Sequence, residues 1–419
     1  MTEDFLQYVW KHQLEDHAHR RLADGQPIEI IDRGVHNADS GPDFFNAKIK
    51  IGETLWAGNV ELHLKSSQWY RHNHHLDKAY DSVILHVVAD HDREVLDASG
   101  VPVPVYVMKI PESVIGNYTA LTSNATWPAC NQHIRQLDAT KTGFWLGRMG
   151  VERLQSKTET VNKLFVQHQG SWEAVWLQLL ASAMGFRVNK EPFVLLMQRT
   201  PFKVILKESH SLFRLEALLF GQAGLLDDAS DEYSHKLRQE YAFLQQKHDI
   251  KPMPGYLWKF ARMRPGNFPT LRLAQFAALI HKHPAMVSVL LQIDNTAALR
   301  RFFDAGVSDY WHTHYRFGAE SKPSAKKLSD ETVNLLLINV VAPFVFFYGK
   351  YHDDEGICTR VTEWLADTAP ENNYITRRWS ECGMEAENAL ASQALLHLRE
   401  HYCLRYRCVH CYVGSEVIR

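Results

Sequence analysis

The sequence predicts an α/β (α+β) N-terminal domain with a small mixed sheet, followed by a large all-α domain. Two observations lead to this prediction. Apolar and polar residues alternate as in β-strands up to about Met108, and from about Cys130 the apolar residues recur at helical spacing instead. A chain of 419 residues is long enough for two or three domains. We therefore expect an α/β domain over 1–130, a helical domain over 131–380, and a C-terminal helix with a cysteine knuckle over 381–419.

The first domain is expected to begin with an amphipathic helix and to continue with short strands. Thr2 is a suitable N-cap, acids occupy the first turn, and apolar residues recur at helical spacing from Phe5 to Leu14. The run 83–88 is apolar almost throughout, as in a central strand covered on both faces. The run 101–108 alternates but contains prolines, which favour an edge position. Strands are expected over 28–31, 47–51, 60–65, 83–88 and 101–108.

The stretch 37–65 carries the residues with the clearest chemistry. Its last strand alternates, so Glu61, His63 and Lys65 share the face opposite to its apolar side chains. This row is either the solvated face of an edge strand or a site, because polar groups are costly to bury without partners. Asp43 begins the preceding strand, and a hairpin would place it beside Glu61. Two facing carboxylates repel unless a cation lies between them, and such oxygen ligands suit Mg²⁺ or Mn²⁺.

Pro42-Asp43, followed by an acid two residues before a basic side chain on a strand, resembles the core of the PD-(D/E)XK nuclease superfamily. The resemblance implies a metal-dependent nuclease acting on DNA or RNA. Asp43 and Glu61 would hold Mg²⁺ or Mn²⁺, and His63 or Lys65 would position or activate the attacking water. The order of residues is irregular: with Glu61 as the acid, His63 stands where the superfamily has Lys, and with Lys65 as the base, His63 stands where the superfamily has an acid. This irregularity keeps open a catalytically inactive nuclease-fold protein that binds nucleic acid or acts as a protein-interaction scaffold.

The polar loop after this strand is rich in histidine, with His72, His74 and His75 close together. Such a loop is either an ordinary surface or capping segment, or part of the site. Imidazole titrates near neutral pH and can move protons, so we expect His72 and His74 to contact the substrate. The resemblance also implies a further acid from the opening helix, for which Glu15 is the nearest candidate, although it is equally suited to a solvated surface.

The second domain is expected to consist of helices. Ser171 and Gly185 are suitable start and stop residues for one of them, and Pro343 should interrupt the apolar segment 333–348. Helices are expected over 145–164, 172–184, 215–226, 233–246 and 271–291, and on both sides of Pro343.

An arginine-rich turn lies between two of these helices. Arg262, Arg264 and Arg272 surround a Pro-Gly-Asn turn, with Trp258 and Phe268 interleaved. Arginine beside aromatic rings is typical of surfaces that meet phosphates or bases. The alternative is an arginine network that braces helix ends. We name the three arginines as candidate substrate-binding residues.

Four of the six cysteines fall in the stretch 381–419. Cys403, Cys408 and Cys411 have the spacing C-x4-C-x2-C, with Cys382 upstream. Zn²⁺ needs four tetrahedral ligands, and these three thiols would supply three of them. The fourth could come from Cys382, His401 or His410. The spacing also matches an iron–sulfur pattern, and the remaining alternative is a set of inert buried thiols.

Composition limits the function classes. The net charge is −2, so the chain as a whole is not a basic nucleic-acid binder, although a local basic groove would be enough. Apolar content of 45% supports packed cores. The N-terminus lacks the basic start and apolar core of a secretory signal, and no apolar run approaches the length of a membrane span. We expect a cytoplasmic protein with free thiols and no membrane association.

A second resemblance extends over the whole chain. The order of GPDF, GNVELHLKSSQW, YDSVILHVV, LEALLFGQAGLL, RPGNFPTLRLAQ and the C-terminal cysteines is similar to a bacterial family, common in Bacteroidetes, that is known only as a domain of unknown function. This resemblance implies a relationship but no chemistry.

Overall fold

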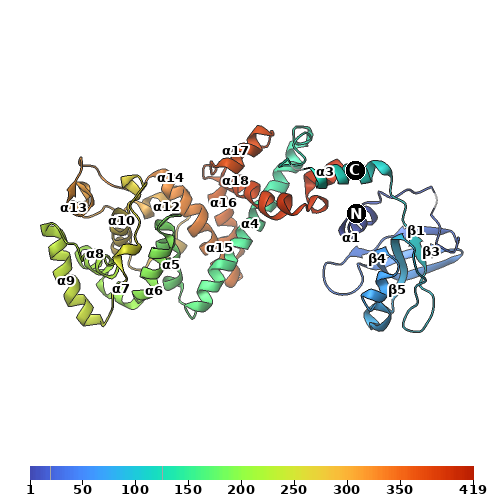
Figure 1. Cartoon of the computed structure of the whole chain (residues 1–419), viewed down its shortest axis with the longest axis horizontal. Helices are drawn as coiled ribbons and strands as arrows, with labels where there is room; N and C mark the ends of the chain where they lie inside the picture. Colours follow the sequence, from blue (N-terminus) through green and yellow to red (C-terminus); the bar gives the residue numbers. More distant parts are fainter. Residues whose placement is uncertain (19, 125) are drawn as a thin grey trace. The chain divides into compact units, whose positions relative to one another are not determined.

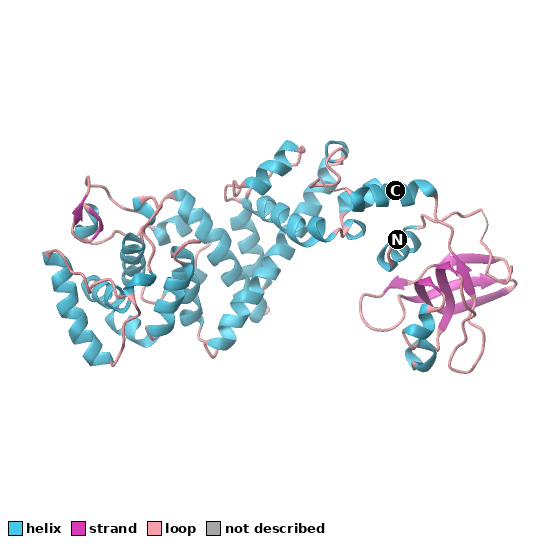
Figure 2. Ribbon diagram, in the orientation of Figure 1, coloured by secondary structure: helices cyan, strands magenta, loops and turns pink. Residues whose placement is uncertain are grey.

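The computed structural model describes residues 1–18, 20–124 and 126–419. The chain forms two compact units. Unit 1 consists of Met1–Trp145, Glu381–Met384 and Leu398–Arg419, and unit 2 consists of Leu146–Ser380 and Glu385–His397. The predicted fold class is confirmed, because the mixed sheet lies in unit 1 and unit 2 is built almost entirely of helices (Figures 1 and 2). The cysteine-rich C-terminus belongs to the same unit as the sheet.

The sheet of unit 1 has six strands in the order β1-β3-β4-β5-β6, and β2 pairs with β3 outside this path. β3 and β4 form an antiparallel hairpin, whereas β4, β5 and β6 run parallel. The hairpin turns at Gly52, whose φ of +57° is a conformation that glycine adopts without strain. The strands are β1 (Ile28–Asp32), β2 (Val35–His36), β3 (Phe44–Ile51), β4 (Thr54–Lys65), β5 (Val83–Asp90) and β6 (Val105–Val107).

Helix α1 (Glu3–His12) begins where the sequence predicts it. The Thr2 hydroxyl accepts a hydrogen bond from the Phe5 N–H at 3.2 Å and caps the helix. Its apolar face, which includes Phe5, Val9 and Trp10, is completely buried. The predicted strand 101–108 is reduced to β6, because prolines at 102 and 104 have no N–H to donate to the ladder.

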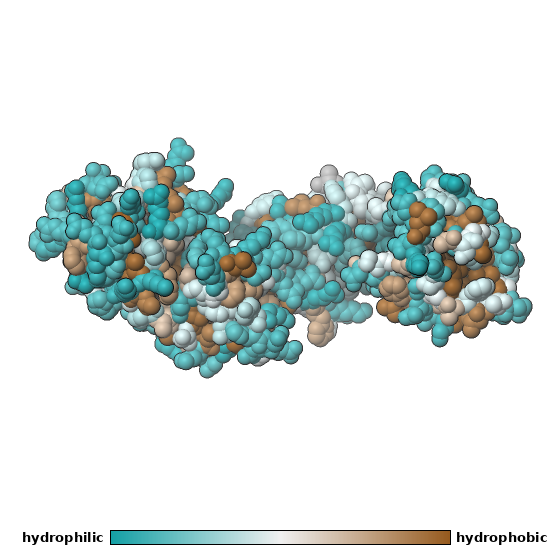
Figure 3. All heavy atoms as spheres, turned by 90° about the horizontal axis from the view of Figure 1, so that it is seen from below, coloured by the Kyte–Doolittle hydropathy of each residue, from teal (hydrophilic) through white to brown (hydrophobic). Residues whose placement is uncertain are grey.

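Unit 1 also presents apolar side chains to solvent. Ile31, Val35, Leu55 and Trp56 are exposed on or between neighbouring strands. Figure 3, which shows one face of the molecule, has apolar patches on this unit within a mostly hydrophilic surface.

Helices make up nearly all of unit 2 and share one large apolar core. Ser171 and Gly185 flank α5 as predicted. Between β4 and β5 in unit 1 lies the short helix α2 (Gln68–Arg71), and α3 (Glu112–Ser123) and α19 (Tyr412–Ile418) also belong to unit 1. The remaining helices are α4 (Ala139–Gln167), which begins in unit 1, α5 (Trp172–Met184), α6 (Lys190–Arg199), α7 (Phe202–Glu208), α8 (Leu212–Gln222), α9 (Glu232–His248), α10 (Pro269–Lys282), α11 (Met286–Leu291), α12 (Thr296–Phe303), α13 (Asp309–His312), α14 (Asp330–Leu336), α15 (Ala342–Tyr351), α16 (Glu355–Ala366), α17 (Tyr374–Glu381) and α18 (Ala389–His397).

Two predicted helices are interrupted for the same reason. The segment 271–291 divides into α10 and α11 at His283-Pro284, because proline disfavours helical backbone at the residue before it. In the segment 333–348, a π-helical turn over Leu337–Val341 joins α14 to α15, which has Pro343 in its first turn. The interruption predicted at Pro343 is therefore a local change of helix type.

The expectation that no apolar run approaches membrane length was wrong for Asp330–Tyr351. This run of 22 helical residues is long and apolar enough to cross a membrane, and most of its apolar part is buried inside the structure. A core helix of a soluble protein passes the same test of length and composition, so the run does not decide where the protein resides.

Replacing Gly221 by Ala is expected to destabilise unit 2. A Cβ at this position of α8 would lie 2.0 Å from the ring of Tyr241 on α9, so the ring or the helix backbone would have to shift. We expect the overpacking to cost about 1–3 kcal/mol, which outweighs the gain of up to about 1 kcal/mol from helix propensity. Thermal unfolding measures the effect. Gly147→Ala on α4 is the control, because nothing lies within 4 Å of its added Cβ, and it should not lower the Tm.

Candidate metal centre

Asp43 and Glu61 lie side by side in the β3–β4 hairpin. The antiparallel register pairs Phe44 with Val60. Asp43, which precedes Phe44, therefore lies beside Glu61, which follows Val60. The Asp43 N–H donates to Glu61 Oε2 at 3.1 Å, and the Leu62 N–H donates to Asp43 Oδ2 at 2.9 Å. Each carboxyl group is therefore held by backbone next to the other one.

Glu61 is buried, Asp43 is half-buried, and the charge of Glu61 disfavours ionisation of Asp43. Burial raises the pKa of Asp43 to about 7, and the charge of Glu61 adds to the effect. Burial raises the pKa of Glu61 to about 8, with Glu3 as a further cause. A cation near the pair would remove both penalties, because an opposite charge favours ionised carboxylates.

Three imidazoles gather beside Glu61. One ligand nitrogen from each of His63, His72 and His74 lies within 4.8 Å of the others. Glu61 Oε1 is 3.5 Å from His63 Nε2 and 3.3 Å from His74 Nε2, and His63 Nε2 is 3.1 Å from His72 Nδ1. Ion–ligand bonds of about 2.1 Å bring neighbouring ligand atoms to about 3–3.5 Å. The spacing of the three histidines therefore fits one ion, and Glu61 contacts two of them.

Two of these histidines, His63 and His74, are held in the neutral form that metal binding requires. Burial lowers the pKa of His63 to about 2, and the charges of His86 and His74 lower it further. Burial also lowers the pKa of His74. The buried Nε2 of His74 has no hydrogen-bond partner among the described residues. Neutral imidazole with a free nitrogen is the form that binds metal ions.

Further residues hold the side chains of the acid pair and the histidines in place. His63 Nδ1 and His86 Nε2 are 2.8 Å apart, so one ring donates to the other and fixes its orientation. The His74 ring stacks on Tyr80 at 3.8 Å. Gln7 on α1 donates to Asp43 Oδ1 at 2.8 Å. The site is thus supported by the sheet, the opening helix and the histidine loop.

Two residues singled out in the sequence lie outside this cluster. Lys65 shares the strand face of Glu61 and His63, but its amine is 3.4 Å from Asp90 on β5 and its side chain is 58% exposed. Glu15 forms ion pairs with Arg20 and Arg33 instead of joining the site. The acid from the N-terminal helix that acts on Asp43 and Glu61 is Glu3.

The three predicted arginines lie in unit 2 and are separated by their environment. Arg262 and Arg264 are exposed, whereas Arg272 is buried on α10. Arg264 and Arg272 line one cavity, and Arg262 is absent from its lining. No sequence pattern pointed to Lys326, a buried cation of the same cavity.

Four of the five cysteines of unit 1 line a separate cavity of about 120 Å³. Its lining includes the predicted Cys403, Cys408 and Cys411, together with Cys130. Cys382 is buried outside this lining, although its thiol contributes to raising the pKa of Cys130.

The thiols that line this cavity influence one another. Burial raises the pKa of Cys130 to about 12, and Cys403 and Cys408 add to the effect. Burial also raises the pKa of Cys411, while the backbone N–H groups of Gly414 and Val413 lower it. A metal centre near these thiols would favour their thiolate form, because its positive charge stabilises the negative charges on sulfur.

The residues missed by sequence reasoning had weak signals. His86 is the one polar residue in the apolar run Val83–Val88 of a buried strand, a pattern that could have identified it. Cys130 has no local motif, and only its residue type could have suggested a role. Gln7 and Glu3 resemble ordinary polar positions of an amphipathic helix.

A comparison with protein families finds one match that spans most of the chain. The family is described as "Protein of unknown function (DUF2851)", and its model matches residues 3–374. No curated protein and no solved structure matches the chain. The matched range contains the whole candidate metal centre and Cys130, and it ends before the C-terminal cysteines.

Proposed function

We propose that this chain, which belongs to the DUF2851 family, is a metal-dependent hydrolase of phosphodiester bonds in DNA or RNA, with its site in unit 1. The observation that carries the proposal is the convergence of two adjacent carboxyl groups, one buried and one half-buried, and three imidazoles at the start of β3, on β4 and in the loop after β4. The resemblance of Asp43 and Glu61 to the acids of the PD-(D/E)XK superfamily supports the choice of substrate.

The ligand set favours a transition metal over Mg²⁺. Carboxylates alone suit Mg²⁺, whereas imidazole is a better ligand for softer ions. Glu61 with His63 and His74 is a mixed set that fits Mn²⁺ or Zn²⁺. A bound ion would polarise a phosphoryl oxygen and lower the pKa of a nearby water.

The protein's own groups have separate roles in this proposal. Glu61, His63, His72 and His74 bind the ion, and His86 fixes the ring of His63. Asp43 lies beside Glu61 and accepts the proton of the attacking water. Lys65 is exposed on the same strand face, where an amine can approach an anionic phosphodiester.

Removal of one imidazole tests the metal site directly. His74→Ala is expected to weaken Mn²⁺ or Zn²⁺ binding at least about tenfold in calorimetric titration, since loss of even a supporting group costs about 10–100-fold. His75→Ala is the matched control, because its ring packs edge-to-face against Tyr70 and is not in the ligand group. Equal affinities for the two variants would contradict the site.

Activity is tested by incubating the full chain with single-stranded DNA, duplex DNA and RNA in Mg²⁺, Mn²⁺ or Zn²⁺. Cleavage should require an ion and stop when EDTA is added. If the protein binds an ion but cleaves none of these substrates, the hydrolase proposal is wrong.

A second candidate function is an inactive nuclease-fold protein that binds nucleic acid or a protein partner. The observation that favours it is the neutral imidazole of His63 at the position where the superfamily has a charged Lys. Binding of nucleic acid without cleavage in every ion would support this candidate. Capture of one protein partner with no nucleic-acid affinity would support the scaffold.

We also propose that Cys130, Cys403, Cys408 and Cys411 hold an iron–sulfur cluster rather than Zn²⁺. Zn–S bonds of about 2.3 Å in a tetrahedron would bring the sulfurs to about 3.8 Å from one another. Unlike the three imidazoles, the thiols form no group within 4.8 Å in the part of the chain that the structure describes. Their wider spacing around a cavity fits a cofactor of several atoms.

A further inference from the structure

Unit 2 contains a cavity of about 530 Å³ whose charged lining residues are mainly basic. It lies at the start of α10 and α14, both labelled in Figure 1, beside the turn Pro265–Asn267 and the segment 324–329. Four of its lining residues are basic and one is acidic: Arg264, Arg272, Lys326, Lys327 and Glu331. The exposed Lys327 is already paired with Asp304 at 2.8 Å, which leaves three cations for the cavity.

Arg272 is a buried guanidinium without a carboxylate partner among the described residues. It is 5% exposed, and its two terminal nitrogens donate to Gln275 Oε1 at 2.9 Å and Asn267 Oδ1 at 2.7 Å. Its Nε is buried and finds no hydrogen-bond partner in the part of the chain that the structure describes. The guanidinium lies over the Phe186 ring at 4.7 Å. Neutral amides and an aromatic ring hold the group in place but leave its charge uncompensated.

Lys326 is a second buried cation that lacks a carboxylate partner among the described residues. It is 7% exposed, and its amine lies 3.4 Å above the centre of the Tyr315 ring and donates to Ser321 Oγ at 3.2 Å. Its backbone has a φ of +47°, which is unusual for a residue other than glycine. Within the described residues, no carboxylate pairs with it. Burial and backbone strain of this kind persist where the surrounding structure holds a functional side chain in place.

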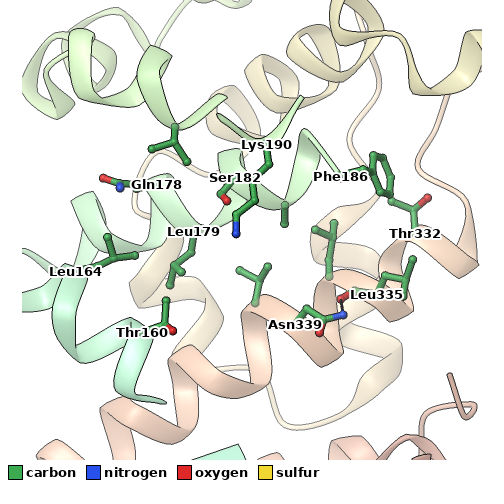
Figure 4. A pocket seen from close by; sticks show the side chains of 14 residues that line it. Thr160, Leu164, Gln178, Leu179, Ser182, Phe186, Lys190, Thr332, Leu335 and Asn339 are labelled. Atoms are coloured by element: carbon green, nitrogen blue, oxygen red, sulfur yellow. Dashed lines mark hydrogen bonds between the residues drawn. The ribbon is translucent and has the colours of Figure 1, made fainter. Parts of the chain in front are cut away.

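A neighbouring cavity offers room for an organic group. It has a volume of about 460 Å³. It shares Phe186, Thr332 and Leu335 with the first cavity, which is called the basic cavity from here on. Its walls are mainly apolar, and Lys190 extends into it (Figure 4). A ligand with an anionic end and an apolar or aromatic body would fit the two adjoining spaces.

We propose that the basic cavity binds the phosphate group of a nucleotide or of a nucleic-acid strand, with Arg272 and Lys326 as its buried ligands and Arg264 at its mouth. Arginine and lysine are the side chains that recognise phosphate, and the hydroxyls of Ser324 and Ser329 can donate further hydrogen bonds. This assignment is independent of the proposed hydrolase, since every residue it uses lies in unit 2.

The test measures binding to the full chain by thermal shift and fluorescence anisotropy. The probes are pyrophosphate, a nucleoside triphosphate, and one oligonucleotide with either a 5′-phosphate or a 5′-hydroxyl. Arg264→Gln should weaken binding roughly tenfold, because a charge-assisted hydrogen bond is lost. Arg262→Gln is the matched control, since this exposed arginine belongs to the same turn but does not line the cavity.

The probes distinguish the sources of the phosphate. Tighter binding of the nucleoside triphosphate than of either oligonucleotide assigns the cavity to a free nucleotide. A preference for the 5′-phosphate assigns it to a strand end, and equal binding of both oligonucleotides assigns it to the strand backbone. Arg272→Gln should also weaken binding, and the exposed Arg264 keeps the test valid if that variant unfolds. If no probe binds, or if the Arg262 and Arg264 variants behave alike, the proposal is overturned.

Discussion

Replacing Glu61 by Gln is expected to lower the rate of metal-dependent nucleic-acid cleavage by about 10²–10⁴-fold. The amide can still accept the Asp43 N–H, so the hairpin should be retained. It loses the negative charge that faces the imidazoles of His63 and His74. The measurement is the initial rate of cleavage at saturating Mn²⁺, together with the Kd for the ion.

Glu53→Gln is the control for this variant, because Glu53 lies in the turn of the same hairpin and its side chain is 98% exposed. It should leave the rate and the ion affinity unchanged. Equal rates for the Glu61 variant and the wild type would show that the acid pair does not serve catalysis. Loss of rate with unchanged ion affinity would place Glu61 outside the ligand set and contradict its proposed role.

The same substitution has a consequence for stability in EDTA. The folded-state pKa values of Asp43 and Glu61 are raised to about 7 and about 8, above their ordinary values. The folded state therefore binds more protons than the unfolded state between about pH 4.5 and 8, and stability falls as the pH rises through this window. The Glu61 variant should show a weaker fall in Tm, and excess Mn²⁺ should weaken the fall in the wild type.

The sequence could predict the acid pair because both acids belong to one hairpin. Alternation fixes which residues of β4 share a face, and a two-stranded register then places Asp43 beside Glu61. The histidines were visible in the sequence, but their position was not. His74 is brought under Glu61 by a loop in which Asn73 has a φ of +62° and Tyr80 stacks on the imidazole, and no periodic pattern encodes such a loop.

The cavity lined by cysteines shows the same limit of prediction from sequence, over a larger separation along the chain. The spacing of Cys403, Cys408 and Cys411 is local and could be recognised. Cys130 meets them only because the chain leaves unit 1, builds unit 2 and then returns to pack against the residues after α3. Contact between segments this far apart depends on tertiary structure and does not follow from local spacing. From the sequence, Cys382 was therefore the nearest further thiol that could be suggested.

Replacing Cys130 by Ala is therefore expected to abolish cofactor binding, whereas Cys382→Ala should preserve it. The wild-type chain, purified without oxygen, should contain iron and acid-labile sulfide and absorb visible light. Cys130→Ala and Cys403→Ala should each lose nearly all of the iron. Because the thiols come from two distant segments, loss of the cofactor should also lower the Tm of unit 1. Metal analysis, sulfide analysis and thermal unfolding measure these effects.

Cys358→Ala is the matched control, since this half-buried thiol belongs to unit 2 and does not line the cavity. It should retain the iron content of the wild type. Stoichiometric zinc without iron would show that the sulfurs move together around a single ion and would contradict the cluster. If Cys382→Ala lost the metal and Cys130→Ala kept it, the ligand set would be the one that the local sequence spacing suggests. If Cys382→Ala retained iron and Cys130→Ala lost it, the fourth ligand would be Cys130. The return of the chain to unit 1 places this residue beside the other three cysteines.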